Sequence, residues 1–326
     1  MLPSPLQDKN ILVTGGTGSF GRRFIRRALE GHDPRRIVVF SRDELKQYEL
    51  QHELGADPRV RFFIGDVRDR ERLMRAFRDI DIVVHAAALK QVPAAEYNPF
   101  EATKTNILGA QNVLEAALDQ GVKRVVALST DKACSPINLY GATKLVSDKL
   151  FVAANAYAGS HDTRFAVVRY GNVVGSRGSV VPLFRRLAPT GVIPVTDPRM
   201  TRFWITLDQG VDFVIQSLGV MHGGELFVPK IPSMRILDLA NALAPNARLE
   251  TVGIRPGEKL HEEMIGVDDS RRTVDAGGYY VMRPDADWWN VTAWDSYDPV
   301  PEGFRFASDT NDRWLTTEEL KAMVES

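Results

Sequence analysis

Residues 11–21 read ILVTGGTGSFG, an apolar run that enters a glycine-rich turn directly before a helical pattern. Glycines at such a turn let the backbone approach a pyrophosphate, and the following helix directs its N-terminus at that anion. A glycine triplet alone also occurs in plain turns, so the surrounding pattern has to support the interpretation. The phosphate-binding residues predicted here are Gly15, Thr17, Gly18, Ser19, Phe20 and Gly21.

Short apolar runs alternate with longer amphipathic segments through the first half of the chain. The expected strands, rich in Val and Ile, span residues 11–14, 37–40, 60–64, 82–85, 125–128 and 165–169. The expected helices span residues 20–29, 44–54, 70–77, 101–119 and 139–157. This alternation predicts the α/β class and a doubly wound parallel Rossmann sheet with helices on both faces.

The residues after the second expected strand bear on the choice of dinucleotide. An NAD site usually has Asp or Glu there for the ribose 2′-hydroxyl, whereas this chain has Ser41, Arg42 and, further on, Lys46. These side chains suit a 2′-phosphate and favour NADP over NAD, although Asp43 would repel that phosphate unless it points away. Other cofactor-binding residues are expected at later strand ends: Asp66, Val67, Ala86, Ala87, Ala88 and Tyr170.

The regular alternation fades after Tyr170, where Gly and Pro become frequent. Helices are expected at residues 206–220 and 234–243, and a third begins near Thr316, where Glu319 completes a capping-box pattern. Residues 1–170 are therefore expected to form the NADP-binding Rossmann domain. Residues 171–326 are expected to form a smaller C-terminal substrate-binding lobe, with some segments returning to the Rossmann domain.

Tyr140 and Lys144 form a Tyr-x-x-x-Lys pair, and a spacing of four puts both side chains on one helix face. A free tyrosine has a pKa of about 10 and is a poor base at neutral pH. A nearby ammonium and a positively charged nicotinamide stabilise the phenolate, so Tyr140 is expected to deprotonate a sugar hydroxyl as hydride leaves the same carbon. Lys144 is also expected to hold the nicotinamide ribose.

Thr130, Asp131 and Lys132 follow the fifth expected strand, at the edge where parallel sheets bind ligands. Thr130 is expected to hydrogen-bond the oxygen on the carbon being oxidised. Asp131 and Lys132 are a candidate acid/base pair, which an elimination needs and a plain reduction does not; a surface ion pair is the alternative. His85 is interpreted as a packed strand residue and Cys134 as incidental.

Composition limits the class of protein. The 326 residues carry a formal net charge of −1, so no overall field attracts nucleic acid or an acidic membrane surface. Cys134 is the only cysteine, which excludes an internal disulfide and fits a reducing, cytoplasmic compartment. No secretory-signal pattern, membrane-spanning apolar run or metal-ligand cluster is recognised.

Several longer motifs resemble one known family. Besides TGGTGSFG and STDKACSPINLYGATK (129–144), they are LKQVPAAEYNP (89–99), RYGNVVGSRGSVVPLF (169–184), MTRFWITL (200–207), GELFVPKIPSMR (224–235) and GIRPGEKLHEEMI (253–265). Together they resemble the inverting UDP-N-acetylglucosamine 4,6-dehydratases of the pseudaminic acid pathway, within the extended short-chain dehydrogenase/reductase family. The resemblance spans roughly residues 10–325. Cys134 and Ser135 depart from the usual Ala-Asn, and residues 286–297 (ADWWNVTAWDSY) match nothing specific.

The resemblance implies dehydration of UDP-N-acetylglucosamine to a UDP-4-keto-6-deoxy-N-acetylhexosamine through transient oxidation at carbon 4 by tightly bound NADP. Tyr140 would deprotonate the hydroxyl on carbon 4, neutral Lys132 would remove the proton on carbon 5, and protonated Asp131 would donate to the hydroxyl leaving carbon 6. Reprotonation from the opposite face, by Lys132 or Tyr140, would invert carbon 5. Burial favours the neutral forms of Asp131 and Lys132, whereas their mutual attraction opposes this.

The same resemblance implies a set of substrate-binding residues: Lys90, Asn172, Val180, Arg202, Arg255 and Glu258. It also implies a homo-oligomer. A UDP-sugar 4-epimerase or reductase, a configuration-retaining dehydratase and a non-catalytic NADP-binding module remain as alternatives. The Trp-rich segment at residues 286–297 has three possible roles, namely shaping the sugar pocket, forming an oligomer surface, or packing as a loop, of which loop packing is preferred.

Overall fold

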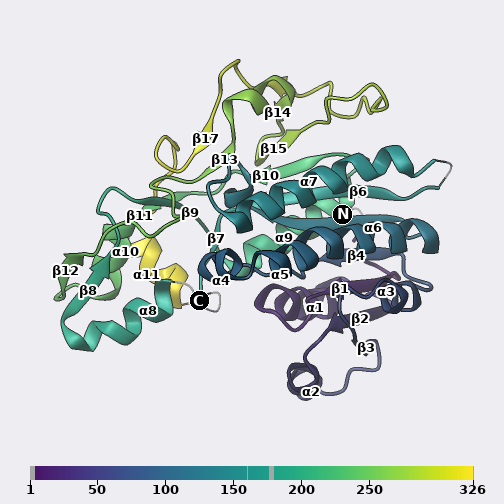
Figure 1. Cartoon of the computed structure of the whole chain (residues 1–326), viewed down its shortest axis with the longest axis horizontal. Helices are drawn as coiled ribbons and strands as arrows, with labels where there is room; N and C mark the ends of the chain where they lie inside the picture. Colours follow the sequence, from purple (N-terminus) through teal and green to yellow (C-terminus); the bar gives the residue numbers. More distant parts are fainter. Residues whose placement is uncertain (1–3, 160, 176–179, 326) are drawn as a thin grey trace.

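The computed structural model describes residues 4–159, 161–175 and 180–325, and its core is one large, mostly parallel sheet (Figure 1). In spatial order, the parallel strands are β3 (Val60–Ile64), β2 (Arg36–Ser41), β1 (Asn10–Thr14), β4 (Ile82–His85), β5 (Arg124–Thr130), β6 (Arg164–Tyr170) and β10 (Leu226–Pro229). Antiparallel strands β15 (Tyr279–Met282), β14 (Thr273–Asp275) and β16 (Asp298–Pro299) extend the sheet beyond β10. The predicted doubly wound sheet is confirmed.

Helices cover both faces of the sheet, as right-handed crossovers require. Along one face, α6 (Gly109–Gln120) lies between α3 (Arg70–Ala76) and α7 (Leu139–Tyr157). On the other face, α1 (Ser19–Gly31) packs against α9 (Leu207–Val220). Polar side chains cap the N-termini of several helices by accepting hydrogen bonds from backbone N–H groups. They are Asp43 for α2 (Glu44–Glu53), Asp69 for α3, Asn138 for α7 and Thr206 for α9.

A second hydrophobic cluster lies in a smaller lobe at the left of Figure 1. Its helices are α8 (Val180–Leu187), α10 (Ile236–Leu243) and α11 (Thr317–Glu325). Its strands are β8 (Val192–Val195) paired with β12 (Arg248–Thr251), and β9 (Thr201–Ile205) between β7 (Asn172–Val173) and β11 (Ser233–Arg235). Trp204 and Phe184 are among its fully buried side chains, so this lobe has a core of its own.

Two expected helices differ from their predicted extents. The helix expected at residues 234–243 begins only at Ile236, because Met234 pairs with Arg202 between β11 and β9. The helix expected at residues 101–119 consists of α5 (Pro99–Thr103), the π-helical turn η1 (Lys104–Leu108) and α6. Periodicity alone did not reveal the strand pairing or the wider turn.

The Trp-rich segment at residues 286–297 packs as a loop, as preferred from the sequence. Trp294 is buried against Phe227 of β10, and its indole N–H donates to Glu225 at 3.0 Å. Trp289 donates to the carbonyl of Gly223 at 2.8 Å. The segment therefore covers the antiparallel side of the main sheet rather than the ligand-binding edge.

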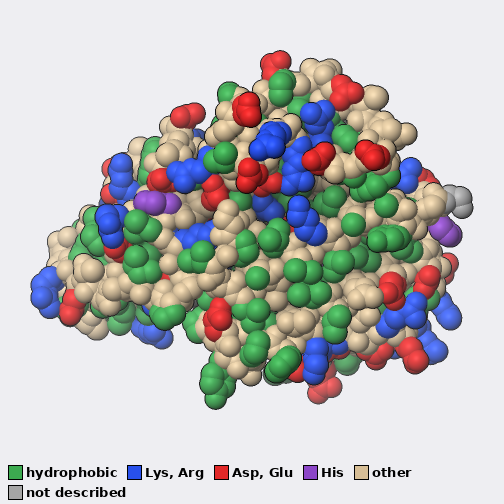
Figure 2. Space-filling model, turned by 45° about the horizontal axis from the view of Figure 1, so that its top comes forward, with side chains coloured by type: hydrophobic (Ala, Val, Ile, Leu, Met, Phe, Trp, Pro, Cys, Tyr) green, Lys and Arg blue, Asp and Glu red, His purple; other side chains and the backbone are tan. Residues whose placement is uncertain are grey.

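Basic and acidic side chains are intermixed over the face seen in Figure 2. This distribution agrees with the formal net charge of −1. In the part of the chain that the structure describes, no helix is long and apolar enough to cross a membrane.

Candidate active site

A cavity of about 870 Å³ lies along the edge where the parallel strands end. Gly15 follows β1, Arg42 follows β2, Asp66 follows β3, Ala86 follows β4 and Asp131 follows β5, and all five line the cavity. Parallel strands end at one edge of a sheet, so loops that are far apart in the sequence meet there.

All residues predicted for the site lie in the walls of this one cavity. They are Gly15, Thr17, Gly18, Ser19, Phe20, Gly21, Ser41, Arg42, Lys46, Asp66, Val67, Ala86, Ala87, Ala88, Lys90, Thr130, Asp131, Lys132, Tyr140, Lys144, Tyr170, Asn172, Val180, Arg202, Arg255 and Glu258. Residues 176–179 of the motif at 169–184 lie outside the described residues. The cavity continues from the sheet edge into the smaller lobe, where Trp204 and Met234 also line it.

The glycine-rich loop lines the cavity beside the start of α1. Gly15 has a φ of +65°, and a Cβ there would lie 2.9 Å from the backbone N of Ala87, so a larger residue would disturb the packing of β1 on β4. Helix α1 begins after Gly18 with no side-chain cap and no acidic residue in its first turn. Its N-terminal N–H groups therefore have no competing anion, which fits a dinucleotide pyrophosphate.

The carboxylate of Asp43, just after the end of β2, is paired with Lys46. Asp43 accepts the backbone N–H of Lys46 at 3.0 Å and pairs with the ammonium of Lys46 at 2.6 Å. The hydrogen bond and charge of Lys46 hold the pKa of Asp43 below its usual range. Ser41 bonds the hydroxyl of Thr17 at 2.7 Å, and Arg42, which is 3.7 Å from Asp66, remains largely exposed.

Tyr140 and Lys144 reach the cavity from the first turns of α7. Burial raises the pKa of Tyr140 to about 12, while the positive charge of Lys132 and a hydrogen bond with Thr130 act in the opposite direction. Lys144 is buried, and burial lowers its pKa despite the carboxylate of Asp148. A base at Tyr140 therefore needs additional positive charge beside the phenol.

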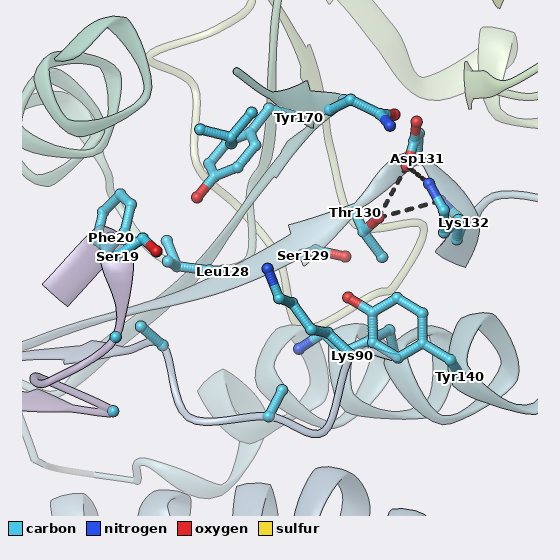
Figure 3. A pocket seen from close by; sticks show the side chains of 18 of the residues that line it. Ser19, Phe20, Lys90, Leu128, Ser129, Thr130, Asp131, Lys132, Tyr140 and Tyr170 are labelled. Atoms are coloured by element: carbon cyan, nitrogen blue, oxygen red, sulfur yellow. Dashed lines mark hydrogen bonds and ion pairs between the residues drawn. The ribbon is translucent and has the colours of Figure 1, made fainter. Parts of the chain in front are cut away.

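Asp131 and Lys132 occupy the short 3₁₀ turn η2 (Asp131–Ala133) after β5, on the same side of the cavity as Tyr140 (Figure 3). Lys132 Nζ lies 3.1 Å from Asp131 Oδ1, which also accepts the hydroxyl of Thr130 at 2.8 Å. Asp131 is fully buried, so the pair is not a surface ion pair. Asp131 Oδ2 has no hydrogen-bond partner within the described residues.

Glu262 is a second carboxylate beside Lys132, and sequence reasoning did not single it out. Its Oε1 lies 3.4 Å from Lys132 Nζ. Burial alone lowers the pKa of Lys132, but the charges of Asp131 and Glu262 outweigh it and raise that pKa above its usual range. The expectation of a neutral Lys132 is therefore wrong for the resting structure, because two carboxylates rather than one surround the ammonium.

Asn106 and Gly141 also support the site, and neither was identified from the sequence. Asn106, in the π-helical turn η1, bonds both backbone groups of Leu89 at 2.8 and 2.9 Å and the hydroxyl of Thr143 at 3.0 Å. A Cβ on Gly141 would lie 2.1 Å from the carbonyl oxygen of Lys132. The glycine in the motif Tyr-Gly-Ala-Thr-Lys therefore allows η2 to contact α7.

The residues expected to bind substrate differ in exposure and in how many hydrogen bonds they already make within the protein. Arg202 is buried and donates to the carbonyls of Thr201, Leu260 and Lys259, so much of its guanidinium is already occupied. Arg255 is exposed and pairs with Glu258 at 3.1 Å. Burial lowers the pKa of Lys90, which lines the cavity near the end of β4.

His85 is packed within a strand, as expected, and Cys134 lies outside the cavity. His85 is buried in β4, bonds Thr14 at 2.8 Å, and has its pKa lowered to about 3 by burial and the charge of Lys144. Cys134 does not line this cavity, and burial raises the pKa of its thiol to about 12. Over the described ranges, no group of three or more His, Cys, Asp or Glu side chains is arranged to hold a metal ion.

The parallel sheet, its glycine loop and the Tyr140–Lys144 pair on the helix after β5 define an extended short-chain dehydrogenase/reductase type of protein. Within that class, the chain belongs to the polysaccharide biosynthesis protein family, whose model matches residues 11–284. It is 56% identical to an inverting UDP-N-acetylglucosamine 4,6-dehydratase from Campylobacter jejuni, over 97% of each chain. It is also 43% identical to a UDP-glucose 4-epimerase from Rickettsia akari, over 84% of this chain and 82% of that one.

Solved structures agree with this placement. The crystal structure of Pen from Bacillus thuringiensis is 38% identical, with a TM-score of 0.89 and 98% of both chains covered. DesIV, a dTDP-glucose 4,6-dehydratase from Streptomyces venezuelae solved with NAD bound, is 26% identical, with a TM-score of 0.71, 86% of this chain covered and 93% of that one. The chain therefore shares its fold with a dehydratase that was solved with NAD bound.

Proposed function

We propose that this chain dehydrates UDP-N-acetylglucosamine to a UDP-4-keto-6-deoxy-N-acetylhexosamine with inversion at carbon 5. The observation that carries the proposal is the pair of buried Asp131 and half-buried Lys132, which lines the same cavity as Tyr140 and Lys144. A phenol and an ammonium suffice for oxidation at carbon 4, whereas loss of water across carbons 5 and 6 needs a further acid and base. The 56% identical Campylobacter relative supports the same reaction.

NADP is the proposed cofactor. Ser41, Arg42 and Lys46 line the end of the cavity where a ribose 2′-phosphate would lie, and the carboxylate of Asp43 is engaged by Lys46 and the start of α2. The bound dinucleotide supplies the hydride acceptor for carbon 4 and the hydride returned to carbon 6. The uncapped start of α1 supports pyrophosphate binding.

The chain's own residues have distinct proposed roles. Thr130 hydrogen-bonds the oxygen on carbon 4, and Tyr140 accepts the proton of that hydroxyl. Lys144 holds the nicotinamide ribose and, by its charge, favours the phenolate. Lys132 removes the proton from carbon 5 once carbon 4 is a ketone, and Asp131 protonates the hydroxyl that leaves carbon 6. Each positioned acid or base of this kind contributes about 10²–10⁴-fold to the rate.

Residues 171–326 supply the proposed substrate-binding lobe, apart from the segments that join the main sheet. Arg255 is exposed at the cavity and suits the diphosphate, since a guanidinium matches phosphate oxygens. Glu258 is proposed to accept from the uridine ribose, with Lys90 and Asn172 at the sugar. Val180, also proposed to bind substrate, lines the cavity as well. A cytoplasmic homo-oligomer remains the proposed state, which light scattering after size exclusion tests.

The test is an NMR spectrum and a mass spectrum of the product from UDP-N-acetylglucosamine in deuterated water. We expect loss of one water, deuterium at carbon 5 and inverted configuration there. Retained configuration at carbon 5 would support a retaining dehydratase. An unchanged mass with altered configuration at carbon 4 would support a 4-epimerase, the activity named for the Rickettsia relative, and would refute the proposal.

A further inference from the structure

Glu262 is a buried carboxylate that contacts two cationic residues of the site. Its side chain is 2% exposed, and its Oε1 lies 3.4 Å from Lys132 Nζ and 3.8 Å from Arg202 Nε. It does not line the cavity, so Lys132 stands between Glu262 and any substrate. Its Oε2 makes no hydrogen bond within the described part of the chain.

The other cation beside Glu262 is already occupied. Arg202 donates to the carbonyls of Thr201, Leu260 and Lys259 and contacts the sulfur of Met200. The ammonium of Lys132 lies instead between two carboxylates, Asp131 at 3.1 Å and Glu262 at 3.4 Å. The ammonium of Lys132 is therefore the group with which Glu262 can exchange a proton.

A base at Lys132 needs somewhere to send its proton. The resting lysine is charged, because Asp131 and Glu262 raise its pKa, and a charged lysine cannot accept the proton of carbon 5. Burial raises the pKa of Glu262, while Lys132 and Arg202 lower it and Asp131 raises it. Moving one proton from Lys132 to Glu262 replaces a buried ion pair by two neutral groups and leaves the net charge of the cluster unchanged.

Building on the proposed function, we propose that Glu262 is the proton acceptor that makes Lys132 a base. One N–H bond of the Lys132 ammonium breaks and one O–H bond forms on the Glu262 carboxylate, which yields an amine and a carboxylic acid. The amine then takes the proton from carbon 5 of the sugar. The ammonium formed in this way passes a proton across its 3.1 Å hydrogen bond to Asp131, which delivers it to the hydroxyl that leaves carbon 6. Because it acts through Lys132, Glu262 is a positioning residue rather than a catalytic one.

The test compares E262Q with E263Q in the full-length holoenzyme, with UDP-N-acetylglucosamine in deuterated water. Glutamine keeps the size of the side chain but neither carries the charge nor accepts the proton. E263Q is the matched control, because the carboxylate of Glu263 accepts from Ser135 at 3.0 Å and lies outside the cavity. We expect E263Q to retain the wild-type rate.

For E262Q, we expect oxidation at carbon 4 to persist, seen as absorbance of the reduced nicotinamide. Deuterium incorporation at carbon 5 and loss of water should fall by about 10²–10⁴-fold, and E262D should restore part of the loss. Loss of water at the wild-type rate in E262Q would overturn the proposal. An equal loss of oxidation and elimination would overturn it too, since a general distortion of the site would then explain the effect.

Two controls keep the outcomes separate. If E262Q does not fold or bind cofactor, E262M replaces it, because methionine also lacks the carboxylate. Wild-type deuterium incorporation in E262M overturns the proposal. A wild-type enzyme that removes no water refutes the proposed function together with this inference. A wild-type enzyme that does remove water, alongside an equally active E262Q, refutes the inference alone.

Discussion

At the scale of single residues, the ionisation of Tyr140 governs the first step of the proposed reaction. Only the phenolate accepts a proton, and burial raises the pKa of Tyr140 to about 12 in the absence of a neighbouring nicotinamide. We therefore expect kcat/KM to rise about tenfold per pH unit at low pH and to level off above the apparent pKa of the complete site. A pH profile of the holoenzyme measures this.

Tyr140→Phe checks that Tyr140 is the group responsible. We expect kcat to fall by about 10²–10⁴-fold and the rising limb of the profile to disappear, while cofactor binding persists. A wild-type pH profile in this variant would show that another residue is the base.

Cys134 should be inert despite its place two residues after Lys132. It is 4% exposed, and burial raises the pKa of its thiol to about 12, so about one molecule in 10⁵ carries a thiolate at pH 7. We expect a thiol reagent to label the denatured chain rapidly and the native chain slowly, and Cys134→Ala to keep full activity. Rapid labelling of the native enzyme with loss of activity would contradict this.

At the scale of elements, the contact of η2 with α7 depends on one glycine. The methyl group of Gly141→Ala would lie only 2.1 Å from the carbonyl oxygen of Lys132, so η2 must move. A displacement of about 1 Å of a catalytic group costs about 10²-fold in rate, and we expect kcat to fall by that order.

Gly210→Ala is the matched control, because Gly210 also lies in a helix and an added Cβ meets nothing within 4 Å. We expect it to raise the free energy of unfolding by about 0.5–1 kcal/mol without loss of activity. Urea unfolding and steady-state rates of both variants give the comparison. Equal activity of the two variants would show that the contact with Lys132 is unimportant.

The proposed preference for NADP depends on the junction of β2 and α2. Arg42 is 55% exposed at the side chain and lines the cavity, so it is free to reach a 2′-phosphate. We expect Arg42→Ala to weaken NADP binding by about tenfold and to leave NAD binding nearly unchanged, as calorimetry with both dinucleotides measures. Equal losses for the two would indicate a role at the shared part of the cofactor.

At the scale of the whole molecule, the loop at residues 253–262 joins the smaller lobe to the 3₁₀ turn η2. Lys259 donates to the carbonyl of Cys134 at 2.6 Å, and Asn138, which caps α7, donates to the carbonyl of Gly257 at 2.8 Å. These two bonds set the position of Glu258 and Glu262 relative to the main sheet.

Lys259→Met keeps most of the side chain's length but removes this charged hydrogen bond. We expect KM for the UDP-sugar to rise by about tenfold with a smaller change in kcat, because a loosened loop weakens substrate binding. Steady-state kinetics separate the two constants. A large fall in kcat at unchanged KM would indicate instead that Lys259 acts on the catalytic cluster through Glu262.

The strands, the glycine loop and the spacing of Tyr140 and Lys144 could be derived from the sequence, because each depends on neighbours within one or two turns of chain. The proximity of the predicted site residues also followed, since parallel strands end at one edge. The exact start of α10 and the π-helical turn could not, because the pairing of Met234 with Arg202 and the long-range contacts of Asn106 override local preference.

Local pattern therefore determined the class of fold and the side chains that line the cavity. Tertiary structure alone decided the protonation of Lys132. Glu262 is 130 positions away in the sequence, yet the fold of the chain brings its carboxylate within 3.4 Å of the ammonium. The energy of a buried charge depends on every charge close to it in space, so spacing along the chain cannot reveal it.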